Sequence, residues 1–375
     1  MRDPQRLSRP DCRMFFEAVC AAVRRGIFWS LFGTLCFVGL RAEAQPPVRR
    51  MSEKDPQETP KVRFIKDPLA QEIQTFRHEI RQHYNNRRFD DLEKIAKNLR
   101  TTKAKFANGS WKIVSYYDSL ECRKEEPESM WRLHDRIHRD WITRKPDSVT
   151  AKLAYADFFC SYAWHARGTG YADSVTPEGW KLFRERLESA QKIIDEVRKM
   201  KDKDPFWGTV ALSIALGMGM DKKAYDALLM EAHKAEPSYW GYFVSRAYSL
   251  LPRWHGQPGD WEAFALKSAA LPDGLGAELY ARIVLDLMDC YRNVFDETDA
   301  SWPKTREGLE LMLKRYPDSL EVVNQAALLA FIARDREMFM TMLARANFVG
   351  VSSVWRSPER FYGALKWAQK DRNNE

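Results

Sequence analysis

The sequence predicts an all-α protein, namely an irregular tetratricopeptide-like α-solenoid that winds as a right-handed superhelix of about fourteen helices. Three observations predict this class. Apolar residues recur at spacings of three and four in almost every segment beyond residue 66. The sequence shows no sustained alternation with period two, which is typical of strands. A proline precedes several of the new apolar segments, which indicates a repeating helical unit.

Residues 1–44 have the pattern of a secretory signal peptide. An arginine-containing lead ends at Arg25, an apolar run covers residues 26–40, and an Ala-x-Ala motif ends at Ala44. The run is short for a membrane span, so we expect cleavage after Ala44 and export to the periplasm or the extracellular space. Two alternatives stay open: an uncleaved inner-membrane anchor through residues 26–40, and a true start at Met14.

A linker follows the signal. Residues 45–66 are rich in proline and charge and poor in large apolar side chains, a composition that predicts a disordered linker. Order is expected to begin at Asp67, because its carboxylate can cap a helix and Pro68 fits the first helical position. Residues 67–375 are therefore predicted to form one tetratricopeptide-like repeat domain.

The clearest single helix is predicted between Thr176 and Met200. Thr176 is a favourable N-cap, and the proline that follows it fits the first turn. The apolar face then recurs every three or four residues at Trp180, Phe183, Leu187, Ala190, Ile194 and Val197.

The repeating unit consists of a charged helix end, a proline and a new apolar helix. Pro205 and Pro237 are 32 residues apart, which is close to the tetratricopeptide period of about 34 residues. Between them, two helices are predicted over residues 206–220 and 221–235, and a similar helix pair follows Pro317. Alanines on these helices allow the close approach that stacked helices need.

Charge and motifs exclude several classes of function. Basic and acidic residues alternate along the predicted helices, so the formal net charge of +8 is spread over the chain and no nucleic-acid partner is expected. The sequence has no G-x-S-x-G motif, no Walker A loop and no glycine-rich dinucleotide fingerprint after a strand. No catalytic residue and no cofactor is therefore assigned, and a binding protein is expected before an enzyme.

One histidine pair has the spacing of a metal site. His134 and His138 lie four residues apart, which puts both imidazoles on one face of a helix. Asp135 takes the position of the glutamate in the H-E-x-x-H motif of metalloproteases. However, aspartate is shorter, no third ligand follows at a diagnostic spacing, and the neighbouring arginines repel a dication. We therefore expect a solvated helix face here and no metal.

Two blocks carry the side chains best suited to a binding groove. At residues 164–170 a helical pattern ends on two glycines. Residues 250–265 are rich in proline, glycine and tryptophan, which predicts a stiff turn. Asp260 is the expected N-cap of a helix that begins at Trp261. An arginine guanidinium can form two hydrogen bonds to a carboxylate or phosphate, and the face of an indole ring can pack on a sugar or a peptide. In the alternative that we favour, the arginines bind helix-end carbonyls and the tryptophans wedge the turns. The candidate groove comprises Trp164, His165, Arg167, Arg253, Trp254, His255, Asp260 and Trp261.

The same blocks carry a resemblance. Trp-His-Ala-Arg-Gly at 164–168 and Leu-Pro-Arg-Trp-His-Gly-Gln-Pro-Gly-Asp-Trp-Glu at 251–262, with the Gly-Ser-Trp-Lys turn at 109–112, resemble a bacterial helical-repeat family catalogued as a domain of unknown function. The resemblance extends over about residues 80 to 350, and the Arg-Trp-x-Gly turn is its most specific part. It implies a tetratricopeptide-like fold, often in exported proteins, and no catalytic residues.

Two hypotheses of function follow. In the first, an exported, non-enzymatic solenoid binds a protein or peptide partner on its concave face, with no membrane span left after signal cleavage. In the second, the chain is an enzyme or a receptor for a small anionic ligand, with its site at residues 164–170 and 252–261. A jointly lined pocket favours the second hypothesis and an open aromatic surface favours the first. The sequence indicates neither the partner nor the oligomeric state.

The targeting prediction is tested on protein isolated from its native host. N-terminal sequencing is expected to find a chain that begins at Gln45, because a short apolar run is followed by an Ala-x-Ala site. A chain that still carries residues 26–40 would show a membrane anchor instead.

Overall fold

The structure is a computed structural model that describes residues 61–168, 170, 172–254 and 256–370. Within them the chain forms seventeen α-helices and two short strands, which confirms the all-α prediction. Fourteen of these helices have nine residues or more. None of the helices in the described part of the chain is long and apolar enough to cross a membrane. The predicted signal peptide and most of the predicted linker lie outside the described residues.

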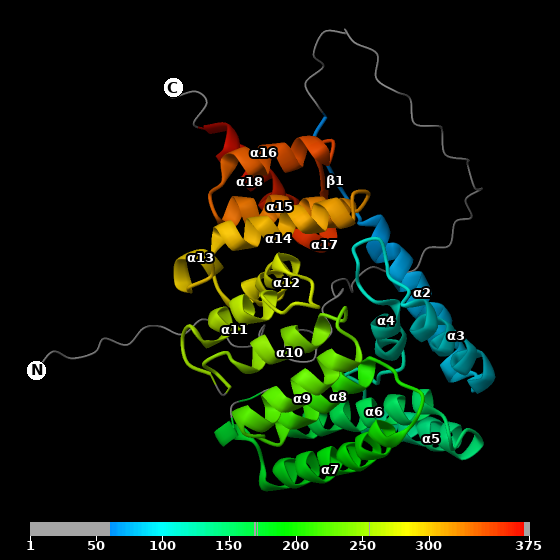
Figure 1. Cartoon of the computed structure of the whole chain (residues 1–375). Coiled ribbons are helices and arrows are strands. Elements are labelled where there is room, and N and C mark those ends of the chain that lie inside the picture. The colour runs from blue at the N-terminus through cyan, green and yellow to red at the C-terminus, as the bar shows by residue number, and fades with distance from the viewer. Residues whose placement is uncertain (1–60, 169, 171, 255, 371–375) are drawn as a thin grey trace, which may run out of the picture.

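Figure 1 labels the elements, which are numbered in chain order. Their bounds are β1 (Arg63–Ile65), α2 (Pro68–Asn85), α3 (Phe89–Thr102), α4 (Lys112–Asp118), α5 (Glu128–Arg144), α6 (Val149–Arg167), α7 (Pro177–Lys199), α8 (Phe206–Gly217), α9 (Lys222–Ala235), α10 (Gly241–Ser249), α11 (Asp260–Ala269), α12 (Ala277–Leu287), α13 (Val294–Glu297), α14 (Trp302–Arg315), α15 (Leu320–Ile332), α16 (Arg336–Arg345), β2 (Val349–Val351), α17 (Ser352–Trp355) and α18 (Pro358–Lys370), with 3-10 turns at Ala172–Ser174 and Met288–Cys290.

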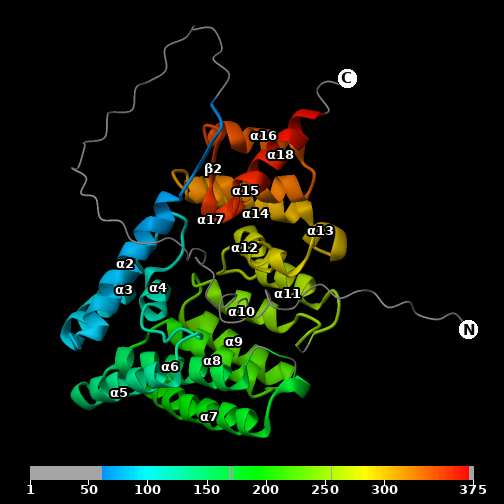
Figure 2. The same ribbon diagram turned by 180° about the vertical axis from the view of Figure 1, so that it is seen from behind.

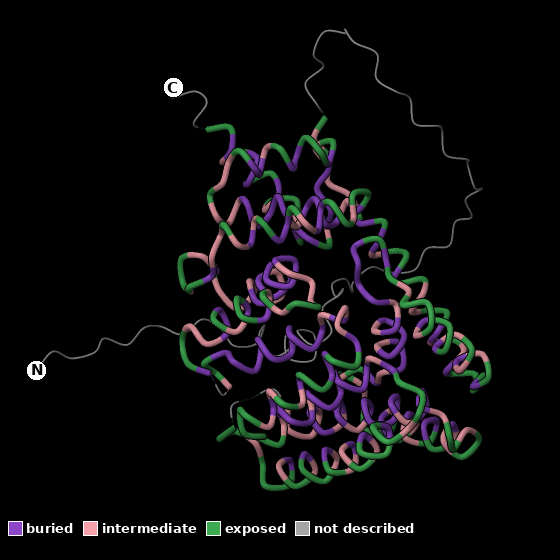
Figure 3. Tube along the Cα trace, viewed as in Figure 1, coloured by how far each residue is buried: buried purple, intermediate pink, exposed green. Residues whose placement is uncertain are grey.

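Helices that follow one another in the sequence pack against each other along most of the chain. Helices α5 to α9 form one end of the molecule, α10 to α12 the middle and α14 to α18 the other end (Figure 1). Five helices, α6, α8, α10, α12 and α15, have most of their residues buried and are called the inner helices. The burial trace shows buried segments through the middle of the stack (Figure 3). The core therefore runs the length of the molecule.

The helices begin where the sequence supplies caps. The Asp67 carboxylate accepts a hydrogen bond from the Leu69 amide at 3.0 Å, and Thr176 caps α7 through the amide of Gly179. Both predicted helix starts are confirmed, as are the predicted helix pairs α8–α9 and α15–α16. In the first of these pairs, α8 ends at Gly217 and the chain turns at once into α9.

A small parallel sheet joins the two ends of the described chain. Residues 63–65, which the predicted linker includes, form β1 and pair with β2 in the register Arg63 to Val349. The Phe64 ring packs on Phe361 of α18, with 6.1 Å between ring centroids. The alternating apolar side chains in this stretch find a partner only in the last helices, so local composition alone does not reveal the strand.

The first helices lie along one side of the stack. Figures 1 and 2 show α2, α3 and α4 running from the α14 to α18 end to the α5 and α6 end. Residues 100–117, here called the N-terminal spine, comprise the end of α3, the loop that follows it and most of α4. They contact each inner helix in its N-terminal half or just before its start.

At α6 and α8 the spine makes polar and aromatic contacts. The Arg100 guanidinium donates to the Thr150 hydroxyl at 2.7 Å and to the Asp204 carboxylate at 3.3 Å. The Tyr117 hydroxyl donates to the same carboxylate at 2.8 Å, and its ring stacks on Phe206 at 4.3 Å between centroids. Asp204 also accepts from the Phe206 amide, so one carboxylate caps α8 and holds the spine.

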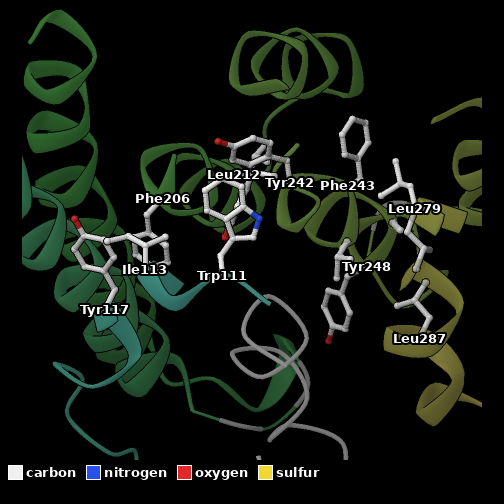
Figure 4. Packing of buried hydrophobic residues seen from close by; sticks show 14 of the residues in the cluster. Trp111, Ile113, Tyr117, Phe206, Leu212, Tyr242, Phe243, Tyr248, Leu279 and Leu287 are labelled. Carbon is white, nitrogen blue, oxygen red and sulfur yellow. The ribbon is translucent and has the colours of Figure 1, made fainter. Parts of the chain in front are cut away.

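At α10 the spine contributes an indole ring that packs on a tyrosine, and a lysine that forms an ion pair. The Trp111 ring meets Tyr239 edge to face at 5.5 Å, within the apolar cluster that Figure 4 shows. Lys103 pairs with Glu236 at 2.8 Å, although more than half of the lysine side chain is exposed, so this pair contributes little to stability.

At α12 and α15 the spine is held by one turn. The Asn108 side chain accepts from the Ser110 amide, and its own amide donates to the Glu321 carboxylate at 3.0 Å. The Arg282 guanidinium donates to the Asn108 carbonyl at 3.2 Å and bonds Glu278 at 2.8 Å. The Asn-Gly-Ser stretch at residues 108–110 therefore forms a buried turn.

Gly109 is the position where this turn tolerates least change. Its φ is +82°, and a Cβ there would lie 2.3 Å from the Tyr316 ring and 2.7 Å from the Arg282 guanidinium. We expect Gly109→Ala to lower the free energy of unfolding by about 2 to 4 kcal/mol, through backbone strain and overpacking together. Gly219→Ala is the matched control, because its φ is +66° but nothing lies within 4 Å of the added methyl. Equal losses in denaturant melts of the two variants would contradict a tightly packed spine.

Candidate functional site

The two sequence blocks meet at the C-terminal ends of the inner helices. The Trp164 ring, near the end of α6, meets the Trp254 ring, in the loop after α10, edge to face at 6.0 Å between centroids. The end of α8 also lies here, since a Cβ on Gly217 would be 3.5 Å from the Trp164 ring. The ends of α6, α8 and α10, with the loop from α10 to α11, are called the C-terminal edge.

Arg167 lies over two indoles of this edge. Its guanidinium carbon is 5.6 Å from the centroid of Trp164 and 5.5 Å from that of Trp180, within cation–π range. It also donates to the Gly170 carbonyl at 3.1 Å, which fixes the chain after the end of α6 at Gly168. Arg167 therefore binds a carbonyl of the loop beyond α6 and not a helix-end carbonyl, and it places a positive charge beside the two tryptophans.

Arg253 reaches toward the 3-10 turn that follows α12. Its guanidinium donates to the Tyr248 hydroxyl at 2.7 Å and lies 3.7 Å from the Cys290 sulfur. The residue is exposed, as is Pro252 before it. These contacts orient the guanidinium at the surface of the edge, where it can also meet a carboxylate.

A close backbone approach fixes the loop that carries Arg253. A Cβ on Gly256 would lie 1.7 Å from the Leu250 carbonyl oxygen, so a side chain there would force the loop apart. Gly259 has a φ of +88°, which glycine adopts without strain. The expectation of a stiff, specified loop is supported at both glycines.

Two of the eight predicted groove residues have other roles. His165 stacks on Trp131 at 4.7 Å between ring centroids, and burial, with the charge of Arg186 added, lowers the pKa of its imidazole. Trp261 is fully buried and donates through its indole nitrogen to the Tyr291 hydroxyl at 3.1 Å. These two side chains are structural, and His255 lies outside the described residues.

Asp260 differs from the prediction. Helix α11 begins at Asp260 itself, with Gly259 in the cap position. The carboxylate accepts from the Gln257 amide at 3.1 Å and lies 3.7 Å from the Lys222 ammonium. Asp260 thus closes the turn in front of the helix, because the glycine at positive φ already sets the direction of the chain.

Two methionines add an apolar part that the sequence did not single out. Met218 is 51% exposed and Met220 is 36% exposed, and both lie in the turn that follows α8. Thioethers are flexible and polarizable, and they are common on surfaces that bind peptides. The sequence signal for this apolar part is the Gly-Met-Gly-Met stretch at residues 217–220.

The histidine pair is buried, which corrects the expectation of a solvated face. His134 and His138 share their side of α5 with the buried Trp131, Ile137 and Trp141. Tryptophan and isoleucine at these spacings mark the apolar face of the helix, and both imidazoles lie on that face.

Both imidazoles are held neutral. The Tyr84 hydroxyl is 3.3 Å from Nδ1 of His134, and its ring packs on His138 at 5.2 Å between centroids. Burial, followed by the charge of Arg81, lowers the pKa of His134 to about 4. Burial, followed by the neighbouring His134, places the pKa of His138 well below its usual value.

A metal centre is not assembled around this pair. Within the described ranges, no three His, Cys, Asp or Glu side chains are grouped so that they could hold a metal ion. Around His138 the neighbours are the rings of Tyr84, Tyr155 and Phe158, which offer no anionic ligand.

Comparisons with family models, with curated proteins and with solved structures find no match for this chain. The resemblance to a bacterial helical-repeat family therefore stays a prediction from the sequence blocks.

The buried histidines predict a loss of stability in acid. An unfolded histidine takes up a proton near pH 6.5, whereas folded His134 does so only near pH 4, so the unfolded state binds more protons between these values. Stability should therefore fall as the pH drops from about 6.5, by up to about 1.4 kcal/mol per pH unit for each buried histidine.

His138→Leu should remove one histidine's share of this slope, while His78→Leu, at an exposed position, should leave it unchanged. Denaturant melts between pH 4 and pH 8 measure both. An unchanged slope in His138→Leu would show that His138 is protonated in the folded protein.

Proposed function

We propose that the protein is a helical-repeat scaffold, a tetratricopeptide-like α-solenoid, that binds a protein or peptide partner. The support is the order of packing, in which consecutive helices contact each other and α6, α8, α10 and α12 form a continuous row. Further support comes from the pairs α8–α9 and α15–α16, each of which is joined by a short turn. On the pattern of residues 1–44, we also propose that the scaffold acts outside the cytoplasm.

The partner surface that we propose is the C-terminal edge. The opposite edge, at the N-terminal ends of the inner helices, is in contact with residues 100–117 of the chain itself. The C-terminal edge instead exposes Met218, Met220 and Arg253. This difference between the two edges is the observation that carries the proposal.

The chemistry of this edge suits a peptide with an apolar side chain beside a carboxylate. The methionines provide the apolar contact, and Arg253 and Arg167 provide the charge that a carboxylate requires. Because both arginines already lie over aromatic rings, little side-chain entropy is lost when they bind.

A second candidate is a receptor or enzyme for a small anionic ligand at the same edge. The observation that favours it is the contact between Trp164 and Trp254, which brings Arg167 and Arg253 to one region of the surface. Saturable binding of inorganic phosphate or citrate in a calorimeter, lost in Arg253→Ala, would support this candidate over the first.

The test compares variants at and away from the edge. Met218→Ser and Arg253→Ala are expected to lower partner recovery from an extract of the native host at least tenfold, since each removes a contact of the proposed surface. Met230→Ser is the matched control, because Met230 is 43% exposed on α9 and is not part of the edge. All three variants should melt within about 1 kcal/mol of the parent protein, as expected for exposed positions.

The same partner must be recovered with the parent protein and with the Met230→Ser variant. Equal recovery with all variants would contradict binding at this edge. A large stability loss in Arg253→Ala would show that the arginine is structural. Partner recovery with Met218→Ser would then decide whether the edge binds the partner.

A further inference from the structure

Two carboxyl groups are buried together where the first helix meets the last ones. Asp67, at the start of α2, is 2% exposed, and Glu321, in the first turn of α15, is 5% exposed. The two carboxyl groups interact directly, and this interaction raises the pKa of Glu321. Such a pair is stable only if one of the two groups keeps its proton.

The remaining contacts identify the proton's position. Asp67 accepts from the Leu69 amide at 3.0 Å and from the Ser353 hydroxyl, so each of its two oxygens already has a donor. On Glu321, Oε1 accepts from Asn108 at 3.0 Å and from Gln325 at 2.9 Å, while Oε2 is buried and finds no donor among the described residues. A proton on Oε2 removes this defect, because the oxygen then donates to Asp67.

The surroundings keep Glu321 protonated near neutral pH. Burial, followed by the charge of Asp67, raises the pKa of Glu321 to about 8. Arg282 of α12 acts in the opposite direction, and it shares the Glu278 carboxylate with Arg315, but the effects of burial and of Asp67 are larger. The other groups that bond the pair come from the spine, from α15 and from α17, and they are uncharged.

We propose that this shared proton is a latch, which holds residues 61–69, here called the strap, on the C-terminal helices and releases them as the pH rises toward 8. The strap comprises β1 and the start of α2, so its attachment consists of the strand pairing with β2, the Phe64 contact with α18 and the carboxyl pair. Two adjacent carboxylates repel each other in a buried site, and the strap is the smaller element, so it is the part that moves.

The sign of the effect follows from proton linkage. In the open state Glu321 is exposed and titrates near pH 4.5, whereas in the closed state it titrates near pH 8. Closing therefore takes up a proton between these values, and the opening equilibrium should rise about tenfold per pH unit in this interval. Below pH 4.5 and above pH 8 the equilibrium should be flat.

Hydrogen–deuterium exchange of the full chain tests the latch. Protection factors, corrected for intrinsic exchange, should fall about tenfold per pH unit between pH 5.5 and pH 7.5 at the amides of Arg63, which bonds the Phe348 carbonyl, and of Leu69. Amides in α7 and α8 should keep constant protection over this range.

Two variants identify the groups responsible. Glu321→Gln and Asp67→Asn should each abolish the pH dependence at the strap, because either change leaves one neutral group able to donate to its partner, and asparagine still caps α2. Glu262→Gln is the matched control, since burial also raises the pKa of Glu262, but this residue bonds the Asp299 amide, away from the strap. It should leave the strap unchanged.

The latch is contradicted if the protection of Arg63 and Leu69 in the parent protein does not change between pH 5.5 and pH 7.5. It is equally contradicted if Glu321→Gln or Asp67→Asn folds and keeps the tenfold dependence. If one variant fails to fold, the other and the parent profile still decide the outcome.

Discussion

The contact of the N-terminal spine with the starts of the five inner helices is the constraint on which the rest of the structure depends. In a simple stack of helices, each unit touches only its neighbours, so distant units are tied through every unit between them. Here, Asn108 bonds Glu321 across 213 positions, and Arg100 bonds Asp204 across 104. The spine thus links both ends of the stack directly. The pairing of β1 with β2 adds a second link between the first and the last elements.

This constraint also makes the two edges of the stack chemically different. At the N-terminal ends, carboxylates such as Asp204 and Glu321 cap helices or bind spine donors, so their hydrogen-bonding capacity is used inside the chain. At the C-terminal ends, Arg253 and the two methionines are exposed instead, and Trp254 is half-buried. A partner at the first edge would have to displace the spine, whereas a partner at the second would not. The proposal of a binding surface rests on this difference.

The features that could be predicted from the sequence are the ones with local causes. Asp67, Thr176 and the prolines mark helix starts because caps act within one turn, and the meeting of Trp164 with Trp254 was expected because two blocks of like composition suggested one site. The bond from Asn108 to Glu321 has no local signal in the sequence. It forms only because the packing of the helices between the two residues brings them together. The burial of His134 and His138 did have a signal, in the tryptophans and the isoleucine on the same helical face, and the charged neighbours concealed it.

The most direct test of the spine's role is to separate it from the stack. Residues 61–118 and 119–370 would be produced as two chains, and the second would be melted alone and with the first added. The account predicts that residues 119–370 alone melt at lower temperature and less cooperatively, and that adding residues 61–118 forms a one-to-one complex with a single sharp transition. A fragment 119–370 that melts alone like the intact chain would contradict the account.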